Sequence, residues 1–97
     1  MKTQIRIYTI KDGELNTFLE EWNIKIKPLR INIGFKVTHA WIEKAKNKFV
    51  WMLTLENEDD WDKLESKYQY SEERKSMFPN TARNILAMEN SFINIME

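Results

Sequence analysis

The side chain best suited to acid–base chemistry in this sequence is His39, the one histidine among 97 residues. Histidine is the side chain whose unperturbed pKa lies close to neutral pH. With a cavity beside it, His39 could act as a general base or as a haem ligand. On a strand, it could equally be a partly buried, hydrogen-bonded structural residue. His39 is therefore the candidate catalytic residue, although the sequence offers it no paired acid or nucleophile at a recognisable spacing.

Large aromatic side chains are the second notable feature. The sequence has four tryptophans, Trp22, Trp41, Trp51 and Trp61, one in each predicted helix and one in each strand of a predicted hairpin. If they converge, they could line a flat apolar pocket for an aromatic or other hydrophobic ligand. Alternatively they simply form the core, which large aromatic side chains dominate in small domains.

Polar side chains alternate with isoleucines near the start of the chain, in the run Ile5-Arg6-Ile7-Tyr8. In a strand this alternation puts Arg6 and Tyr8 on one face, in a region that the sheet should bury. Arg6 could pair with Glu89 in a structural ion pair, or it could anchor an anionic ligand. The candidate ligand-binding residues are therefore Arg6, Tyr8, Trp22, His39, Trp41 and Trp51.

Composition excludes several other kinds of site and partner. Without cysteine, and with a single histidine, the chain offers no disulfide, thiolate nucleophile or multi-histidine zinc site, so we expect no metal and no cofactor. Fifteen basic and fifteen acidic residues cancel, which argues against nucleic acid as a partner. No apolar run is long enough for a membrane helix, and Met1 leads into a strand pattern without a signal-peptide core. We expect a soluble, cytoplasmic protein.

The elements that must position these residues follow from local patterns. The periodicities predict strands at about 3–10, 35–42, 49–55 and 87–95 and helices at about 13–33 and 58–70. Asp12, Asn57 and Ser71 are predicted N-caps. Pro28 should kink the first helix in its last turns, and Gly34 should end it with a left-handed residue. The order strand, helix, strand, strand, helix, strand predicts one α+β domain over 1–97, a four-stranded antiparallel sheet with both helices on one face.

The register of the central hairpin determines which residues share a face. A three-residue loop at 45–47, with Asn47 in the left-handed conformation, pairs Lys44 with Lys48. Trp41 then lies opposite Trp51, and His39 lies opposite Leu53. This register predicts that His39, Trp41 and Trp51 form the sheet wall of any ligand site between the sheet and the helices.

Two strands are apolar on both faces. Val50 and Met52 alternate with Phe49, Trp51 and Leu53 in one, and the strand at 87–95 repeats the pattern. Such strands need cover on both sides, whereas the helices cover only one. We therefore predict a homodimer that forms through the outer sheet faces.

Several segments resemble NIPSNAP-family proteins. The similarity lies in Ile5–Leu15, Phe18, Trp22, Pro28–Arg30, Gly34-Phe35, Phe49–Trp51 and Tyr70–Lys75. The resemblance implies a ferredoxin-like βαββαβ subunit of the dimeric α/β-barrel type. That superfamily includes cofactor-independent monooxygenases, haem-degrading enzymes and isomerases, and related barrels tend to hold the ligand between the sheet and the helices.

Two functions remain in competition. The favoured one is a non-catalytic, dimeric module that binds a small ligand or a protein partner, because no acid–base pair or activated nucleophile is visible. The alternative is a cofactor-independent monooxygenase or isomerase that acts on a small aromatic or hydrophobic substrate. RNA binding on the sheet is disfavoured by the neutral charge and by the absence of the aromatic and basic strand motif.

Overall fold

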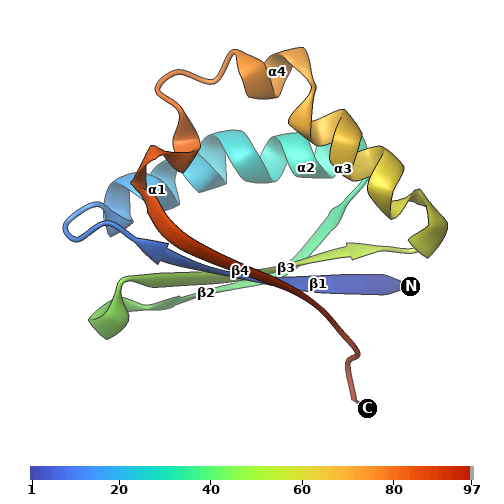
Figure 1. The fold of residues 1–97 in the computed structure, drawn as a ribbon, viewed down its shortest axis with the longest axis horizontal. Helices are drawn as coiled ribbons and strands as arrows, with labels where there is room; N and C mark the ends of the chain where they lie inside the picture. The colour runs from blue at the N-terminus through green and yellow to red at the C-terminus, as the bar shows by residue number, and fades with distance from the viewer. Residues whose placement is uncertain (97) are drawn as a thin grey trace.

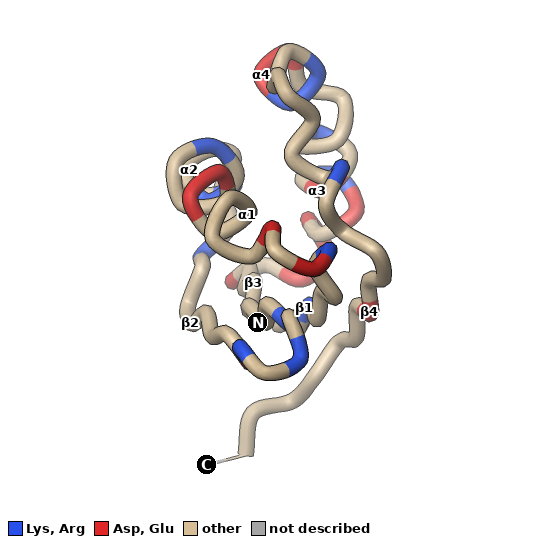
Figure 2. The backbone as a smooth tube through the Cα atoms, turned by 90° about the vertical axis from the view of Figure 1, so that its left-hand side faces the viewer, with Lys and Arg blue, Asp and Glu red and all other residues tan. Residues whose placement is uncertain are grey.

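The predicted order of elements is confirmed by the computed structural model, which describes residues 1–96 (Figure 1). The strands are β1 (Lys2–Ile10), β2 (Lys36–Glu43), β3 (Lys48–Leu55) and β4 (Ile85–Ile93), and the helices are α1 (Leu15–Glu21), α2 (Lys27–Ile33), α3 (Trp61–Gln69) and α4 (Glu72–Lys75). Within the described residues the strands form one four-stranded antiparallel sheet in the order β2-β3-β1-β4. Helices α1 to α4 all lie on the same side of this sheet (Figure 2). The α+β class and the layer arrangement are therefore as predicted.

A π-helical segment, Trp22–Ile26, joins α1 to α2 where the sequence predicted a simple kink at Pro28. The backbone N–H of Lys27 bonds to the carbonyl of Trp22, five residues earlier. In a regular α-helix the Pro28 ring would meet the carbonyl of Ile24, and the wider π-helical turn relieves that clash. The distortion therefore lies one turn earlier than predicted.

The helix ends at Gly34, as predicted, and the backbone there has a positive φ of +133°. This value is more extended than the left-handed conformation that the sequence predicted. A β-carbon at this position would stand 3.3 Å from Leu64 Cδ1, so α3 packs closely against the end of α2 at the glycine.

The hairpin β2–β3 corrects the predicted register. Asn47 adopts the predicted left-handed conformation (φ 52°, ψ 42°). However, a 3-10 turn at Lys44–Lys46 lengthens the loop to residues 44–47, and Glu43 pairs with Lys48. Trp41 consequently lies opposite Val50 rather than Trp51.

A β-bulge between Val37 and His39 then adds a second one-residue shift, so that Val37 pairs with Leu53 and the residues before the bulge return to the predicted face. Phe35 and Val37 face the helices as predicted, whereas His39 and Trp41 lie on the outer face. The predicted placement of His39 and Trp41 is therefore wrong, because a shift of one residue moves a side chain to the opposite face of a sheet.

Ser71 caps α4 as predicted, Asn57 caps the 3-10 turn Glu58–Asp60 that leads into α3, and the predicted cap at Asp12 is wrong. The side chains of Asn57 and Ser71 accept hydrogen bonds from the backbone N–H groups of Asp59 and Arg74. Asp12 does not cap α1. Its carboxylate instead accepts a hydrogen bond from Asn47 Nδ2 at 3.1 Å, which ties the β1–α1 loop to the hairpin.

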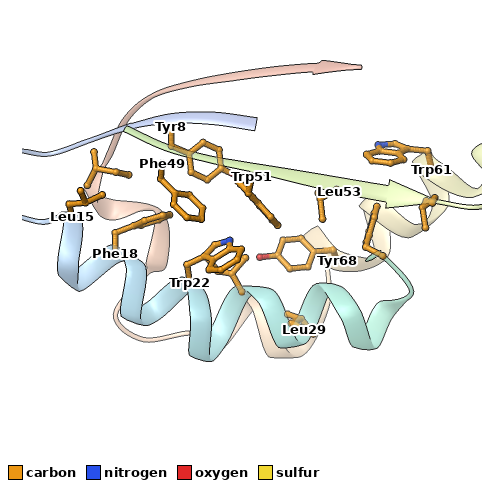
Figure 3. Close-up of a cluster of buried hydrophobic side chains, with 14 residues drawn as sticks. Tyr8, Leu15, Phe18, Trp22, Leu29, Phe49, Trp51, Leu53, Trp61 and Tyr68 are labelled. Atoms are coloured by element: carbon orange, nitrogen blue, oxygen red, sulfur yellow. The ribbon is translucent and has the colours of Figure 1, made fainter. Parts of the chain in front are cut away.

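The core lies between the sheet and the helices, and aromatic rings dominate it (Figure 3). The ring centroid of Trp22 lies 4.8 Å from that of Phe49 and 5.5 Å from that of Trp51, in edge-to-face geometry. Trp61 packs at the other end of the core, 5.2 Å from Phe35. Of the four tryptophans, Trp22 and Trp51 therefore contact each other, whereas Trp41 is 47% exposed on the outer face.

The middle of the outer sheet face is apolar. Ile5 pairs with Met52, and Ile7 and Trp41 flank Val50, so these five side chains share one face. It is the face opposite the helices, because Trp51 lies in the core. No helix within residues 1–96 is both long and apolar enough to cross a membrane.

Candidate ligand site

A cavity of about 60 Å³ lies between the sheet and the helices, in the layer where the sequence analysis expected a ligand site. Its sheet wall is formed by Arg6 and Tyr8 of β1 and Trp51 of β3. Its helical wall includes Arg30 of α2, Tyr68 of α3 and Arg74 of α4.

The structure brings some of the predicted site residues together and separates others. Arg6, Tyr8 and Trp51 line the cavity, and Trp22 packs edge-on against Trp51. His39 and Trp41 stack on each other on the outer face, with ring centroids 5.8 Å apart. The two residues therefore do not form the sheet wall of this cavity, which corrects the predicted site.

A buried ion-pair cluster forms one wall of the cavity. Glu65 of α3 accepts hydrogen bonds from both terminal nitrogens of Arg30 and, at 3.1 Å, from Arg6 Nη2. Arg30 is 1% exposed and Arg6 is 6% exposed. The predicted partner of Arg6 was Glu89, which is wrong: Glu89 lies opposite Ile7 and so projects from the outer face, whereas Arg6 faces the helices.

Three further hydrogen bonds complete this cluster. Arg6 Nε donates to Gln4 Oε1 at 2.8 Å, and Arg6 Nη1 donates to the Tyr8 hydroxyl at 3.4 Å. Gln69 Nε2 donates to Glu65 Oε1 at 3.1 Å. The guanidinium carbon of Arg30 also lies 3.6 Å from the centroid of the Tyr68 ring, so the aromatic face holds the plane of the guanidinium in position.

The cluster keeps its charges at neutral pH. Burial by itself would raise the pKa of Glu65, but the hydrogen bonds and charge of Arg30, together with the charge of Arg6, lower that pKa to about 2. Burial opposes the charge of Arg6, yet Tyr8 and Glu65 outweigh it and raise the pKa of the guanidinium. Burial raises the pKa of Tyr68, so its hydroxyl is neutral and able to donate.

Positive charge is in excess at the cavity. Arg6, Arg30 and Arg74 line it, and Glu65 is the carboxylate that neutralises one of them. Arg74 has no acidic side chain within ion-pair distance among residues 1–96. An arginine is always charged in proteins, so the cavity favours a negatively charged or acceptor-rich molecule.

Two side chains that line the cavity hold a buried donor without an acceptor in the described part of the chain: Arg30 at Nε and Trp51 at Nε1. Trp22 Nε1, beside Trp51, is a third buried donor of this kind. Each such group costs about 1–3 kcal/mol when it is left without a partner. An acceptor atom placed against either of the first two donors would recover that cost.

Sequence reasoning did not place Arg30, Glu65, Tyr68 and Arg74 together. The sequence could have indicated Arg30 and Glu65, because each is a charged residue on the apolar side of its helix. Arg30 follows Ile26 by four positions, and Glu65 follows Trp61 by four. A charge inside an apolar helical stripe indicates a buried ion pair.

The comparisons with known proteins define the fold. No family model and no curated protein matches the chain. Among solved structures, a NIPSNAP family protein from Agrobacterium tumefaciens has a TM-score of 0.88 and 15% identity, covering 99% of this chain and 93% of that one. An antibiotic biosynthesis monooxygenase has a TM-score of 0.69 and 10% identity, covering 100% of both chains.

A dimeric ferredoxin-like protein from an uncultured marine organism has a TM-score of 0.60 and 8% identity, covering 99% of this chain and 94% of that one. The fold is thus that of the ferredoxin-like α+β proteins. Within that class, its structural neighbours at TM-scores of 0.83–0.88 are NIPSNAP-family proteins, which confirms the predicted resemblance at the level of the fold.

Proposed function

We propose that the protein is a homodimeric, non-catalytic small-molecule-binding protein of the NIPSNAP type, and that its ligand occupies the cavity between the sheet and the helices. The observation that carries the proposal is that two side chains lining this cavity, those of Arg30 and Trp51, each hold a buried donor, Nε and Nε1, without an acceptor in residues 1–96. Buried donors without partners lower the stability of the fold, so their presence supports a role in binding. A cytoplasmic location stays a prediction, which cell fractionation tests.

Ligand binding is tested by thermal unfolding and tryptophan fluorescence with a panel of small aromatic and aliphatic compounds. A ligand that binds the folded state raises the melting temperature in a saturable manner. Trp51→Phe removes the indole donor and keeps an aromatic ring, so it should weaken binding. His39→Ala, on the outer face, is the matched control and should bind as the parent does. If no compound of the panel binds, the proposal fails.

The dimer rests on the outer sheet face, where Ile5, Ile7, Val50 and Met52 form an apolar surface with Trp41 at its side. The existence of a dimeric protein with a similar fold supports it. Sedimentation at micromolar concentration should give about twice the chain mass of 11.8 kDa. Trp41→Glu should shift the protein toward the monomer, and Tyr70→Glu, at an exposed site on the helical side, should not. A parent that sediments as a monomer contradicts the dimer.

The alternative function is a cofactor-independent monooxygenase or isomerase. It is supported by the full-length similarity of the fold to an antibiotic biosynthesis monooxygenase and by two tyrosine hydroxyls, those of Tyr8 and Tyr68, at the cavity. Compounds that bind are incubated with the protein while dissolved oxygen and product masses are followed. Turnover that is lost in Tyr68→Phe would favour the enzyme over the binding module.

A further inference from the structure

The hydrogen-bonding groups at the cavity are unbalanced in favour of donors. Oε1 of Glu65 accepts from Arg6, Arg30 and Gln69, and its Oε2 accepts from Arg30. Arg30 Nε is not among the donors to Glu65 and has no other acceptor in residues 1–96. Glu65 also lies beyond ion-pair distance of Arg74.

The remaining donors lie around one space. Arg30 Nε and Trp51 Nε1 are buried donors on side chains that are each 1% exposed, and both side chains line the cavity. Half-buried Arg74 and exposed Gln69 line its outer part. The Tyr68 hydroxyl points into the core toward Trp22 and Trp51 (Figure 3). A molecule in this space lies against the Arg74 guanidinium, the neutral Tyr68 hydroxyl and the two side chains that carry the unpaired N–H donors.

We infer that the ligand is a short-chain carboxylate, held by Arg74 together with Arg30 Nε and Trp51 Nε1. The inference rests on the proposed function and deepens it by naming the chemical class. A carboxylate supplies about four acceptor sites and one negative charge, which matches both the donors and the excess of arginine over carboxylate. An amine would meet the excess positive charge, and a neutral apolar molecule would leave the buried donors without partners.

The size of the cavity limits the length of the ligand. A water molecule needs roughly 10–15 Å³ measured in this way, so the 60 Å³ here hold on the order of four to six non-hydrogen atoms. Acetate, propanoate and small substituted acids fit that space completely. A longer acid must extend past Arg74 and Gln69 toward solvent.

The stacking of Arg30 on Tyr68 makes this a preorganised site. Glu65 holds both terminal nitrogens of Arg30, and the Tyr68 ring holds its face, so the direction of the Nε–H bond is set before any ligand enters. Ser71 fixes the turn that carries Arg74, because its hydroxyl accepts from the Arg74 backbone N–H at 3.1 Å. A ligand therefore binds without having to order these side chains.

The test is titration calorimetry at low ionic strength with propanoate, propanamide and inorganic phosphate. Propanamide has the same number of non-hydrogen atoms as propanoate without the charge, and phosphate has charge without the planar carboxylate. We expect propanoate to bind at least about tenfold more tightly than either, since a charge-assisted hydrogen bond is about twice as strong as a neutral one. Arg74→Gln should weaken propanoate binding by about tenfold, to the level of propanamide. Lys75→Gln, the same charge change on the exposed side of α4, should keep the preference for propanoate.

The outcomes separate this inference from the proposed function. If propanamide binds as tightly as propanoate, the cavity binds small molecules and the carboxylate assignment is wrong. Phosphate binding equal to that of propanoate would show a general anion site and overturn the assignment as well. If propanoate, propanamide and phosphate all fail to bind at tens of millimolar, the assignment fails, whereas the proposed function fails only if the wider compound panel is also negative.

Discussion

The substitution Glu65→Gln examines the buried cluster most directly. It removes the negative charge that lies between Arg6 and Arg30 and leaves two guanidinium groups in the core without a counter-ion. Removing one partner of a buried ion pair costs about 3–5 kcal/mol. The Glu65 side chain is 24% exposed, so water reaches part of the site and we expect the lower end, about 3 kcal/mol. Such a loss is a large part of the roughly 5–10 kcal/mol that stabilises a domain of this size.

Urea unfolding followed by tryptophan fluorescence measures the effect. The free energy of unfolding falls by about 1.5 kcal/mol per molar urea, so a stability loss of about 3 kcal/mol lowers the urea midpoint by about 2 M. Glu56→Gln is the control, because it breaks the Lys36–Glu56 pair, whose side chains are 61% and 69% exposed. Exposed pairs contribute less than about 1 kcal/mol. If Glu65→Gln shifts the midpoint no more than Glu56→Gln does, the cluster does not stabilise the fold and this reasoning is refuted.

Other predictions concern acid stability, the core and one cap. The Glu65 pKa is about 2 in the folded protein against 4.5 for the free side chain, so its contribution is complete above pH 4.5 and is lost as the pH falls toward 2. Allowing for solvent screening, the free energy of unfolding of the parent should fall by about 2 kcal/mol more than that of Glu65→Gln between pH 4.5 and pH 2. Parallel plots of unfolding free energy against pH for the two proteins would contradict this. Trp22→Ala should cost about 3–5 kcal/mol in urea unfolding, and an unchanged midpoint would place Trp22 outside the core. Ser71→Ala should cost about 1 kcal/mol in the same unfolding experiment by loss of the cap, and an unchanged midpoint would contradict this.

Local patterns were sufficient to predict the order of elements, the left-handed Asn47 and the caps at Asn57 and Ser71. Each of these depends on residues within a few positions of one another. The register of β2 was not predictable in the same way. Whether Lys44 belongs to the strand or to the turn differs by one residue, and the bulge before His39 has no glycine or other sequence mark.

The candidate site was predicted where it depends on strand alternation and missed where it depends on tertiary packing. Alternation along β1 correctly placed Arg6 and Tyr8 on one buried face. The pairing of Arg30 with Glu65 joins residues 35 positions apart and exists only after α2 and α3 dock on the sheet. Sequence spacing alone cannot show which of fifteen acidic residues meets a buried arginine.

The position of β1 inside the sheet has a consequence for the kinetics of folding. Its partner on one side is β4, with Thr3 opposite Ile93, so pairing closes a loop that spans almost the whole described chain. Long-range pairing of this kind requires most of the loop-closure entropy to be lost before the contacts form, and it slows folding. While the ribosome is still making residues 85–93, the hydrogen-bonding edge of β1 that faces β4 has nothing from its own chain to pair with. During that interval the nascent protein presents an open strand edge, which is the kind of surface that promotes misassembly between neighbouring chains.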